Sequence, residues 1–457
     1  MAYSSPTTSP IIIQGGQVLL PSGEIEPREV AITDGKITAV GTHLEVPSHT
    51  KTIDATGLTL LPGVIDPHVH FCEPGSEHKE DLFTGTCACV KGGVTSFLEM
   101  PNTLSLRTTP ANLTEKLAIA AAKSLVNYGF FMGAMADNHA GFPDDNPTCG
   151  ITITMDSAVM GSAHGPRSID PTETIEPIFA AGVDAASLHE TRPITVQVEN
   201  PAQSLQHRQQ FASKRNPATS VQDNGVAPVV TAMALELSKK YQRRLHILHM
   251  STGEEAELLR RDKPSWVTAE VTPQHLLLDV SAYQKIGPLA QMNPPLQSPR
   301  DRELLWQALL DGVIDFIATD HNPQTLEEKS SGYPHTPSGI PGIETSLPLM
   351  LTQAKESRCT VAQVSHWMST AVAQAYNIPN KGLIEPGYDA DIVLVDLTTY
   401  RPVLREELKT KCGWSPFEGW NLTGWPVVTL VGGEVVYDHG QLDTTVRGQA
   451  LQFGVLV

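Results

Sequence analysis

Two histidines stand two residues apart in the stretch GVIDPHVHFCEPG, residues 63–75. Side chains two apart on a strand point to the same face, so His68 and His70 can bind one metal ion together. Cys72 follows at the same interval. The spacing alone leaves three interpretations of Cys72 open: a third metal ligand, a nucleophile, or the replacement of a residue that contacted substrate.

Two other stretches place polar side chains at the ends of apolar runs. IDFIATDHNP ends with Asp320 and His321. A carboxylate there can bind the metal or accept a proton from a water, although aspartate also caps helices. RLHILHMST holds His246 and His249, which face opposite ways on a strand because they are three residues apart. We expect His246 to pack in the wall and His249, nearer the strand end, to be the ligand candidate.

The elements that position these residues follow a regular alternation. Between residues 63 and 375, short β-branched runs alternate with helical stretches, which favours a parallel sheet of the α/β class. Eight such units close a TIM-type (β/α)8 barrel, whose catalytic residues stand at the C-terminal ends of the strands. The expected strands include VTSFLEM, YGFFMGAM, GITITM, ITVQVEN, RLHILHM, WVTAEV and IDFIATD. The expected helices include LTEKLAIAAAKSL, VAPVVTAMALELSKKY and DRELLWQALLDG.

Both ends of the chain have a different texture. Residues 1–62 and 376–457 contain short alternating runs that are broken by glycine and proline, which is typical of small antiparallel sheets. Examples are IIIQGGQVLLPSGEI, DIVLVDL, PVVTLVGGEVVYDHG and LQFGVLV. We expect the two ends to fold together into a small β-sandwich beside the barrel.

Composition excludes several classes of function. The net charge of −18 argues against a nucleic-acid partner, because no basic run offsets it. No apolar run reaches about 18 residues, so no membrane span is expected. The six cysteines show no CxxC spacing and follow no signal peptide, so we expect reduced thiols in a cytoplasmic protein.

Several motifs resemble those of the dihydroorotases, in the cyclic amidohydrolase branch of the amidohydrolase superfamily. They are GVIDPHVHFCEPG, KGGVTSFLEMPNT, HILHMST, VTAEVTPQHLLL, QMNPPL, DFIATDHNPQTLEEK and PSGIPGIET. The end segments KGLIEPGYDADIVLVD and WSPFEGWNLTGWPVVTLVGGEVV resemble the family's β-sandwich, so the resemblance covers nearly the whole chain. It implies a metal-dependent hydrolase that opens or closes a cyclic amide.

The resemblance also implies a ligand set that is only partly kept. His68, His70 and Asp320 match the ligands of the more buried metal, with Asp320 also the proton shuttle, and His249 matches a ligand of the second metal. Thr152 stands where the family has a bridging carbamylated lysine, and Gln197 stands where it has another histidine. Since neither is a usual zinc ligand, we expect at most one divalent ion per chain, taken to be zinc.

The family's substrate contacts are altered as well. Cys72 replaces an arginine and Gln324 replaces a histidine, both of which contact the dihydroorotate carboxylate in the family. Asn102 remains as a carboxylate contact, and Asn293 remains as a contact to the ring. A neutral thiol cannot reproduce the paired charged hydrogen bonds of arginine. The resemblance therefore favours reading Cys72 as a lost arginine.

Two functional hypotheses follow. In the first, the protein is a dihydroorotase-like enzyme of pyrimidine biosynthesis that interconverts N-carbamoyl-aspartate and dihydroorotate, with a degenerate metal site and weak or altered activity. In the second, it is an inactive homologue that serves as a structural or regulatory partner, for example of aspartate transcarbamoylase. We expect a small cyclic amide or ureide as substrate and a homo-oligomeric assembly.

Overall fold

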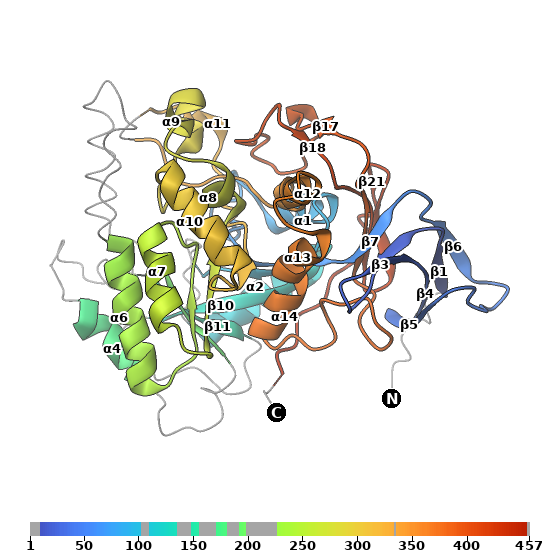
Figure 1. The fold of residues 1–457 in the computed structure, drawn as a ribbon, viewed down its shortest axis with the longest axis horizontal. Helices are drawn as coiled ribbons and strands as arrows, with labels where there is room; N and C mark the ends of the chain where they lie inside the picture. Colours follow the sequence, from blue (N-terminus) through green and yellow to red (C-terminus); the bar gives the residue numbers. More distant parts are fainter. Residues whose placement is uncertain are drawn as a thin grey trace.

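A computed structural model describes residues 10–101, 109–134, 148–154, 171–180, 192–197, 226–332 and 335–454. Figure 1 shows a barrel surrounded by helices, with a separate group of strands on the right of the view. That group contains the strands from the N-terminal end of the chain.

The described strands of the barrel form one parallel sheet of eight, in the order β15-β14-β13-β12-β11-β10-β9-β8. Their bounds are β8 (Val64–Val69), β9 (Val94–Glu99), β10 (Asn127–Ala134), β11 (Thr148–Thr154), β12 (Ile194–Gln197), β13 (Leu245–Ile247), β14 (Val267–Val271) and β15 (Phe316–Ile317). The ring closes through a parallel bridge between Val69 and His321, where His70 N donates to His321 O at 2.9 Å. The expected TIM-type barrel is thus confirmed.

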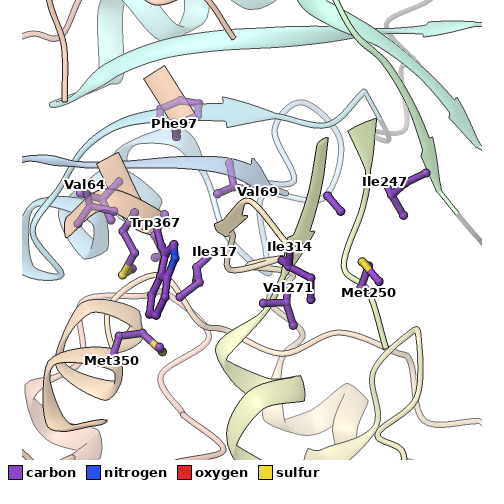
Figure 2. Packing of buried hydrophobic residues seen from close by; sticks show 14 of the residues in the cluster. Val64, Val69, Phe97, Ile247, Met250, Val271, Ile314, Ile317, Met350 and Trp367 are labelled. Atoms are coloured by element: carbon purple, nitrogen blue, oxygen red, sulfur yellow. The ribbon is translucent and has the colours of Figure 1, made fainter. Parts of the chain in front are cut away.

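The barrel is held together by apolar side chains on its strands and on the helices around it. Figure 2 shows part of this cluster, including Val64 and Val69 of β8, Phe97 of β9 and Val271 of β14. The Phe97 ring packs edge-on against Phe71 at a centroid distance of 4.8 Å. Fully buried β-branched and aromatic side chains favour these strands because they pack well on a pleated surface.

Helices follow most of the strands. The longer ones are α1 (Leu82–Lys91), α2 (Pro110–Lys123), α4 (Pro171–Ala180), α6 (Val226–Tyr241), α7 (Gly253–Asp262), α10 (Pro299–Leu310) and α12 (Ser346–Lys355). The shorter ones are α8 (Pro273–Leu277), α9 (Ala282–Lys285), η2 (Gly287–Ala290), α11 (Leu326–Lys329), α13 (Val361–Ser365), η3 (His366–Thr370), α14 (Ala371–Ala375) and η4 (Arg405–Glu407). Capping boxes begin α1 at Asp81, α7 at Thr252 and α10 at Ser298, each satisfying backbone donors of the first turn.

The β-sandwich combines both ends of the chain, as expected. In the described residues, one sheet has the order β5-β4-β1-β6 and the other β21-β20-β19-β16-β7-β2-β3. The N-terminal strands are β1 (Ile11–Gln14), β2 (Gln17–Leu19), β3 (Ile25–Pro27), β4 (Glu29–Thr33), β5 (Lys36–Gly41), β6 (Lys51–Asp54) and β7 (Thr59–Pro62). The C-terminal strands are β16 (Ile392–Asp396), β19 (Trp425–Val431), β20 (Glu434–Asp438) and β21 (Gln441–Leu442), while β17 (Arg401–Pro402) and β18 (Asn421–Leu422) pair separately.

One expected strand of the sandwich is wrong. Residues 451–454 of LQFGVLV form no strand, and residues 455–457 lie outside the described part. Leu451 instead donates its backbone N–H to Tyr128 O of β10 at 2.8 Å, and its side chain is buried. The apolar character of this segment serves packing against the barrel, which a strand-like sequence pattern does not distinguish from pairing in a sheet.

Three other expectations concern the chain as a whole. All six cysteines are free thiols. No helix in the described ranges has the length and apolar character needed to cross a membrane. The limits 1–62, 63–375 and 376–457 stay a prediction, with β7 ending at Pro62 and α14 at Ala375.

Candidate active site

The C-terminal ends of β8 and β15 bring three predicted ligands together in the interior of the protein. His70 Nε2 lies 3.2 Å from His68 Nε2 and 3.0 Å from Asp320 Oδ1. His68 Nε2 lies 3.4 Å from Asp320 Oδ1. All three side chains are buried, and they form the one potential metal-binding group of this kind among the described residues.

The triangle formed by His68 Nε2, His70 Nε2 and Asp320 Oδ1 has the dimensions of a zinc site. Ligand atoms about 2.0–2.1 Å from a tetrahedral zinc lie roughly 3.3 Å from one another. The three edges of 3.0, 3.2 and 3.4 Å in this protein match that spacing. The donor set of two imidazoles and one carboxylate is also one that zinc accepts. The residues present therefore fit a single divalent ion.

Glu270 of β14 orients His68 through Nδ1, the ring nitrogen that is not part of the triangle. Its Oε1 lies 2.6 Å from His68 Nδ1, which places the donated proton there and turns Nε2 toward the triangle. Its Oε2 accepts from His246 Nε2 at 2.9 Å. Burial alone lowers the pKa of His68, but the charges of Glu270 and Asp320 outweigh burial and raise it to about 9. A metal ion and a proton therefore compete for His68 Nε2.

His249 stands beside the triangle at the end of β13. Its ring centroid is 5.3 Å from that of His68, and its side chain is buried. Neither ring nitrogen has a hydrogen-bond partner within the described ranges. Burial lowers the pKa of His249 to about 4, so the ring is neutral near pH 7 and keeps a lone pair. His246 faces the opposite way into the wall, where it stacks on Phe316 at 4.8 Å.

Three residues of this region have left-handed backbone conformations. The φ angles are 60° at Cys72, 31° at His249 and 47° at Asp320, each just after a barrel strand. Such conformations cost roughly 1–3 kcal/mol for a non-glycine residue, and strain of this kind often clusters at functional sites. Here they turn the chain sharply out of the strands, at the positions where the predicted site residues stand.

Asp66 joins the two strands that carry the triangle. It accepts from Thr319 Oγ1 at 2.5 Å and from Thr319 N at 3.1 Å, and also from His68 N at 3.3 Å. Burial raises the pKa of Asp66 to about 6, against the effect of these bonds. The carboxylate thus fixes the relative position of β8 and the segment after β15, and with it the spacing of His68 and Asp320.

Thr152 of β11 makes its own contacts in the wall. It is buried, and its hydroxyl lies 2.9 Å from Thr195 Oγ1 and 3.6 Å from the sulfur of Met100. Its backbone is in register with Gly133 and Thr195 of the neighbouring strands. The hydroxyl is thus occupied by protein partners, and threonine is not a usual zinc ligand.

The other predicted site residues are placed less completely. Gln197 is the last residue of β12, opposite Thr154 of β11. Asn102 lies outside the described residues. Asn293 is half-buried in the segment between η2 and α10, next to Pro294, whose carbonyl oxygen lies 3.1 Å from His275 Nε2 of α8. Because α8 follows β14, this segment lies at the same end of the barrel as the triangle.

Cys72 does not have the environment of a nucleophile or of a metal ligand. Burial raises the pKa of its thiol to about 12, with Glu99 adding to the effect and Lys79 opposing it. The thiol is therefore neutral near pH 7, whereas a catalytic nucleophile needs the thiolate. Its Sγ lies 3.5 Å from His70 O, and it does not belong to the potential metal-binding group.

Glu270 and Asp66 are the site residues that the sequence interpretation missed. A signal was present, because VTAEV and GVIDP each place one carboxylate in an otherwise apolar run that becomes a buried strand. Acidic side chains are almost never fully buried unless they are paired. Glu270 pairs with histidines of β8 and β13, and Asp66 pairs with Thr319 after β15, so their roles could be seen only once the barrel had closed.

Comparisons with known proteins bear on the identity of this site. Residues 59–436 match the model of the amidohydrolase family. The dihydroorotase of Methanosarcina acetivorans is 32% identical over 444 residues, covering 94% of this chain and 93% of its own. A dihydroorotase of Listeria monocytogenes is 33% identical over 449 residues, covering 94% and 99%.

Solved structures of cyclic amidohydrolases share the whole architecture. An L-hydantoinase from Arthrobacter aurescens superimposes with a TM-score of 0.86 at 26% identity, covering 97% of this chain and 99% of its own. A dihydropyrimidinase from Brevibacillus agri gives a TM-score of 0.86 at 24% identity, covering 98% and 99%, and supports the fold alone. The match to the family model over most of the chain, together with relatives above 30% identity, shows that this protein belongs to the amidohydrolase family.

Proposed function

We propose that the protein is a dihydroorotase-like hydrolase that opens or closes a cyclic amide ring, using one divalent metal ion held by His68, His70 and Asp320. The observation that carries this proposal is the buried triangle with edges of 3.0–3.4 Å. The names of the sequence relatives point to dihydroorotate and N-carbamoyl-aspartate as the pair that is interconverted.

The proposed chemistry is hydrolysis of a ring amide. A divalent ion held by His68, His70 and Asp320 would supply a Lewis acid for the ring carbonyl and for water. The hydroxyl of water adds to the carbonyl carbon, the ring carbon–nitrogen bond breaks, and the nitrogen takes a proton. Ring closure runs through the same steps in reverse.

Asp320 is the residue proposed to carry the proton. Burial opposes its ionisation, but the charge of His68 and the hydrogen bond to His70 outweigh burial and lower the pKa of Asp320. The side chain is therefore a carboxylate near pH 7, able to accept a proton from the attacking water and return it to the leaving nitrogen.

A single ion is proposed because Thr152 and Gln197 stand where the family resemblance implies two donors to a second ion. The Thr152 hydroxyl is bonded to Thr195, and threonine is not a usual zinc ligand. His249, with two unpartnered ring nitrogens in the described structure, remains as a donor beside the triangle but does not belong to the group of three. We propose zinc as the ion, from the imidazole-rich donor set.

The same substitutions support low turnover as part of the proposal. One Lewis acid in place of two offers less stabilisation of charge at the carbonyl oxygen in the transition state. With Cys72 neutral and Gln324 uncharged, two contacts to a carboxylate that the family resemblance implies are also altered. If turnover is absent, a structural or regulatory role beside another enzyme, such as aspartate transcarbamoylase, is the alternative.

A ring-opening assay tests the proposed function. We expect the zinc-loaded protein to hydrolyse dihydroorotate with a kcat below about 1 per second, under the range of about 1–10³ per second that is ordinary for enzymes. Product formation should be followed by chromatography in both directions, with dihydrouracil and hydantoin as other rings. The Asp320→Asn variant serves as the control for background hydrolysis. Absence of turnover on all three rings would contradict the proposal and favour the alternative.

A further inference from the structure

A lysine connects the two loops that follow the strands of the metal site. One loop begins at Cys72 after β8, and the other runs from Asp320 after β15. Lys79, on the first loop, donates from Nζ to Oε1 of Gln324, on the second, at 2.7 Å. The ammonium group of Lys79 therefore lies between the two loops, at the end of the barrel where the triangle stands.

The surrounding contacts hold both residues in place. The carboxylate of Glu80, next in sequence to Lys79, is buried and accepts from Lys411 N and from the hydroxyl of Thr410. Gln324 O accepts from Trp414 Nε1 at 2.7 Å, and Gln324 Nε2 donates to Asn322 Oδ1 at 3.0 Å. A cation on such a fixed backbone is preorganised, so less entropy is lost when it binds a ligand.

Two lysines, Lys79 and Lys116, act on the Cys72 thiol. In the described structure, Lys79 is the one that keeps a hydrogen-bond donor for a ligand. Lys116, the other lysine that acts on the Cys72 thiol, is buried and paired with Glu99 at 2.7 Å. Lys79 has one hydrogen bond to an uncharged amide oxygen and a longer contact of 3.4 Å to Glu328 Oε1. A lysine ammonium has three donors. One of them has no acceptor in the described structure.

Glu328 does not neutralise Lys79 fully. Its Oε2 accepts from Thr325 N and the Thr325 hydroxyl in the capping box that begins α11. Its Oε1 also lies 3.3 Å from His78 Nε2. The side chain of Lys79 is 20% exposed, so it can be reached by a ligand while part of its stem is packed. In a chain of net charge −18, a local cation of this kind is what an anionic ligand needs.

We propose that Lys79 determines specificity by binding an anionic group, a carboxylate, on the ring substrate. This inference rests on the proposed function and assigns to this chain a residue that selects cyclic amides with a carboxylate over those without one. The amide oxygen of Gln324 accepts from Lys79, whereas a histidinium in its place would repel the ammonium. Lys79 and Gln324 thus form one unit, in which a lysine supplies the positive charge that Cys72 does not.

Calorimetric titration of two ligands that differ only in the charged group tests this inference. Dihydroorotate carries a carboxylate on its ring, and dihydrouracil is the same ring without it. We expect the protein as purified to bind dihydroorotate more tightly. Lys79→Met should reduce this preference by about 10- to 100-fold, the range of one charge-assisted hydrogen bond. Affinity for dihydrouracil should not change, and Lys79→Arg should retain part of the preference.

Lys123→Met is the matched control, because Lys123 of α2 forms an ion pair with Glu73, which lies on the same loop as Lys79. It should leave the preference for dihydroorotate intact. A Lys79→Met variant that keeps the preference, or that weakens both ligands equally, would overturn the inference. Equal binding of the two ligands by the wild type would overturn it too, and would leave ring hydrolysis standing. If the wild type binds neither ligand, the proposed function itself is contradicted.

Discussion

Asp320→Asn is expected to lower kcat for ring opening by about 10²- to 10⁴-fold relative to the wild type, the usual contribution of a positioned general acid–base. The carboxylate is buried, and its Oδ1 lies 3.0 Å from His70 Nε2. An amide cannot accept the proton of water at neutral pH. Asparagine also tolerates the left-handed backbone that Asp320 adopts at φ 47°, so the change tests chemistry more than folding.

Metal content must be measured on the same samples, because Asp320 is also a proposed ligand. The comparison is made at metal concentrations that give equal loading of the two proteins. Glu255→Gln is the matched control: it alters a buried carboxylate in the capping box of α7, away from the triangle. It should lose stability with a much smaller loss of kcat. A fully loaded Asp320→Asn variant with the wild-type kcat would contradict the role of Asp320.

Glu270→Gln is expected to weaken metal binding by about 10- to 100-fold, the usual effect of losing a carboxylate that orients a histidine ligand. Glu270 contacts His68 Nδ1 at 2.6 Å, His246 Nε2 at 2.9 Å and His249 N at 3.2 Å. A glutamine has one acceptor oxygen in place of two and adds an NH2 group. One of the two imidazoles therefore faces a donor, which disturbs the tautomer that turns His68 Nε2 toward the metal.

The same variant should also be less stable. A buried polar group without its partner costs roughly 1–3 kcal/mol, so we expect a loss of that size in the free energy of unfolding. Glu255→Gln is the matched control, since Glu255 is equally buried and accepts from Thr252 and Thr231 in the capping box of α7. It should lose stability but keep its metal affinity. Unchanged metal affinity in Glu270→Gln, measured by competition with a chelator, would show that His68 is oriented by other contacts.

Much of the fold could be predicted because local patterns and the final structure agree. The helix VAPVVTAMALELSKKY is α6 with the expected bounds, and alternation in GVIDPHVH places His68 and His70 on one face. The grouping of these histidines with Asp320 follows from the barrel, since strand ends that are far apart in sequence meet at one mouth.

Other features depend on contacts that no local pattern reveals. IDFIATD reads as a full strand, but only Phe316–Ile317 pair as β15 before the chain turns through Asp320 in a left-handed conformation. The bond from Lys79 to Gln324 joins residues 245 positions apart, and a lysine in a polar loop gives no sign of such a partner. Glu270 acquires its role only because β13 and β8 bring histidines to either side of it.

Zinc stoichiometry is the measurement that tests the central claim most directly. Elemental analysis of the purified protein after zinc loading and removal of excess ion should give one zinc per chain. In His70→Ala, which removes a ligand atom of the triangle, the tightly bound zinc should be lost. Two zinc ions per chain would contradict the single-ion site and the reading of Thr152 as a wall residue. No bound zinc in the wild type, or retention of zinc in His70→Ala, would contradict the assignment of the triangle as the metal centre.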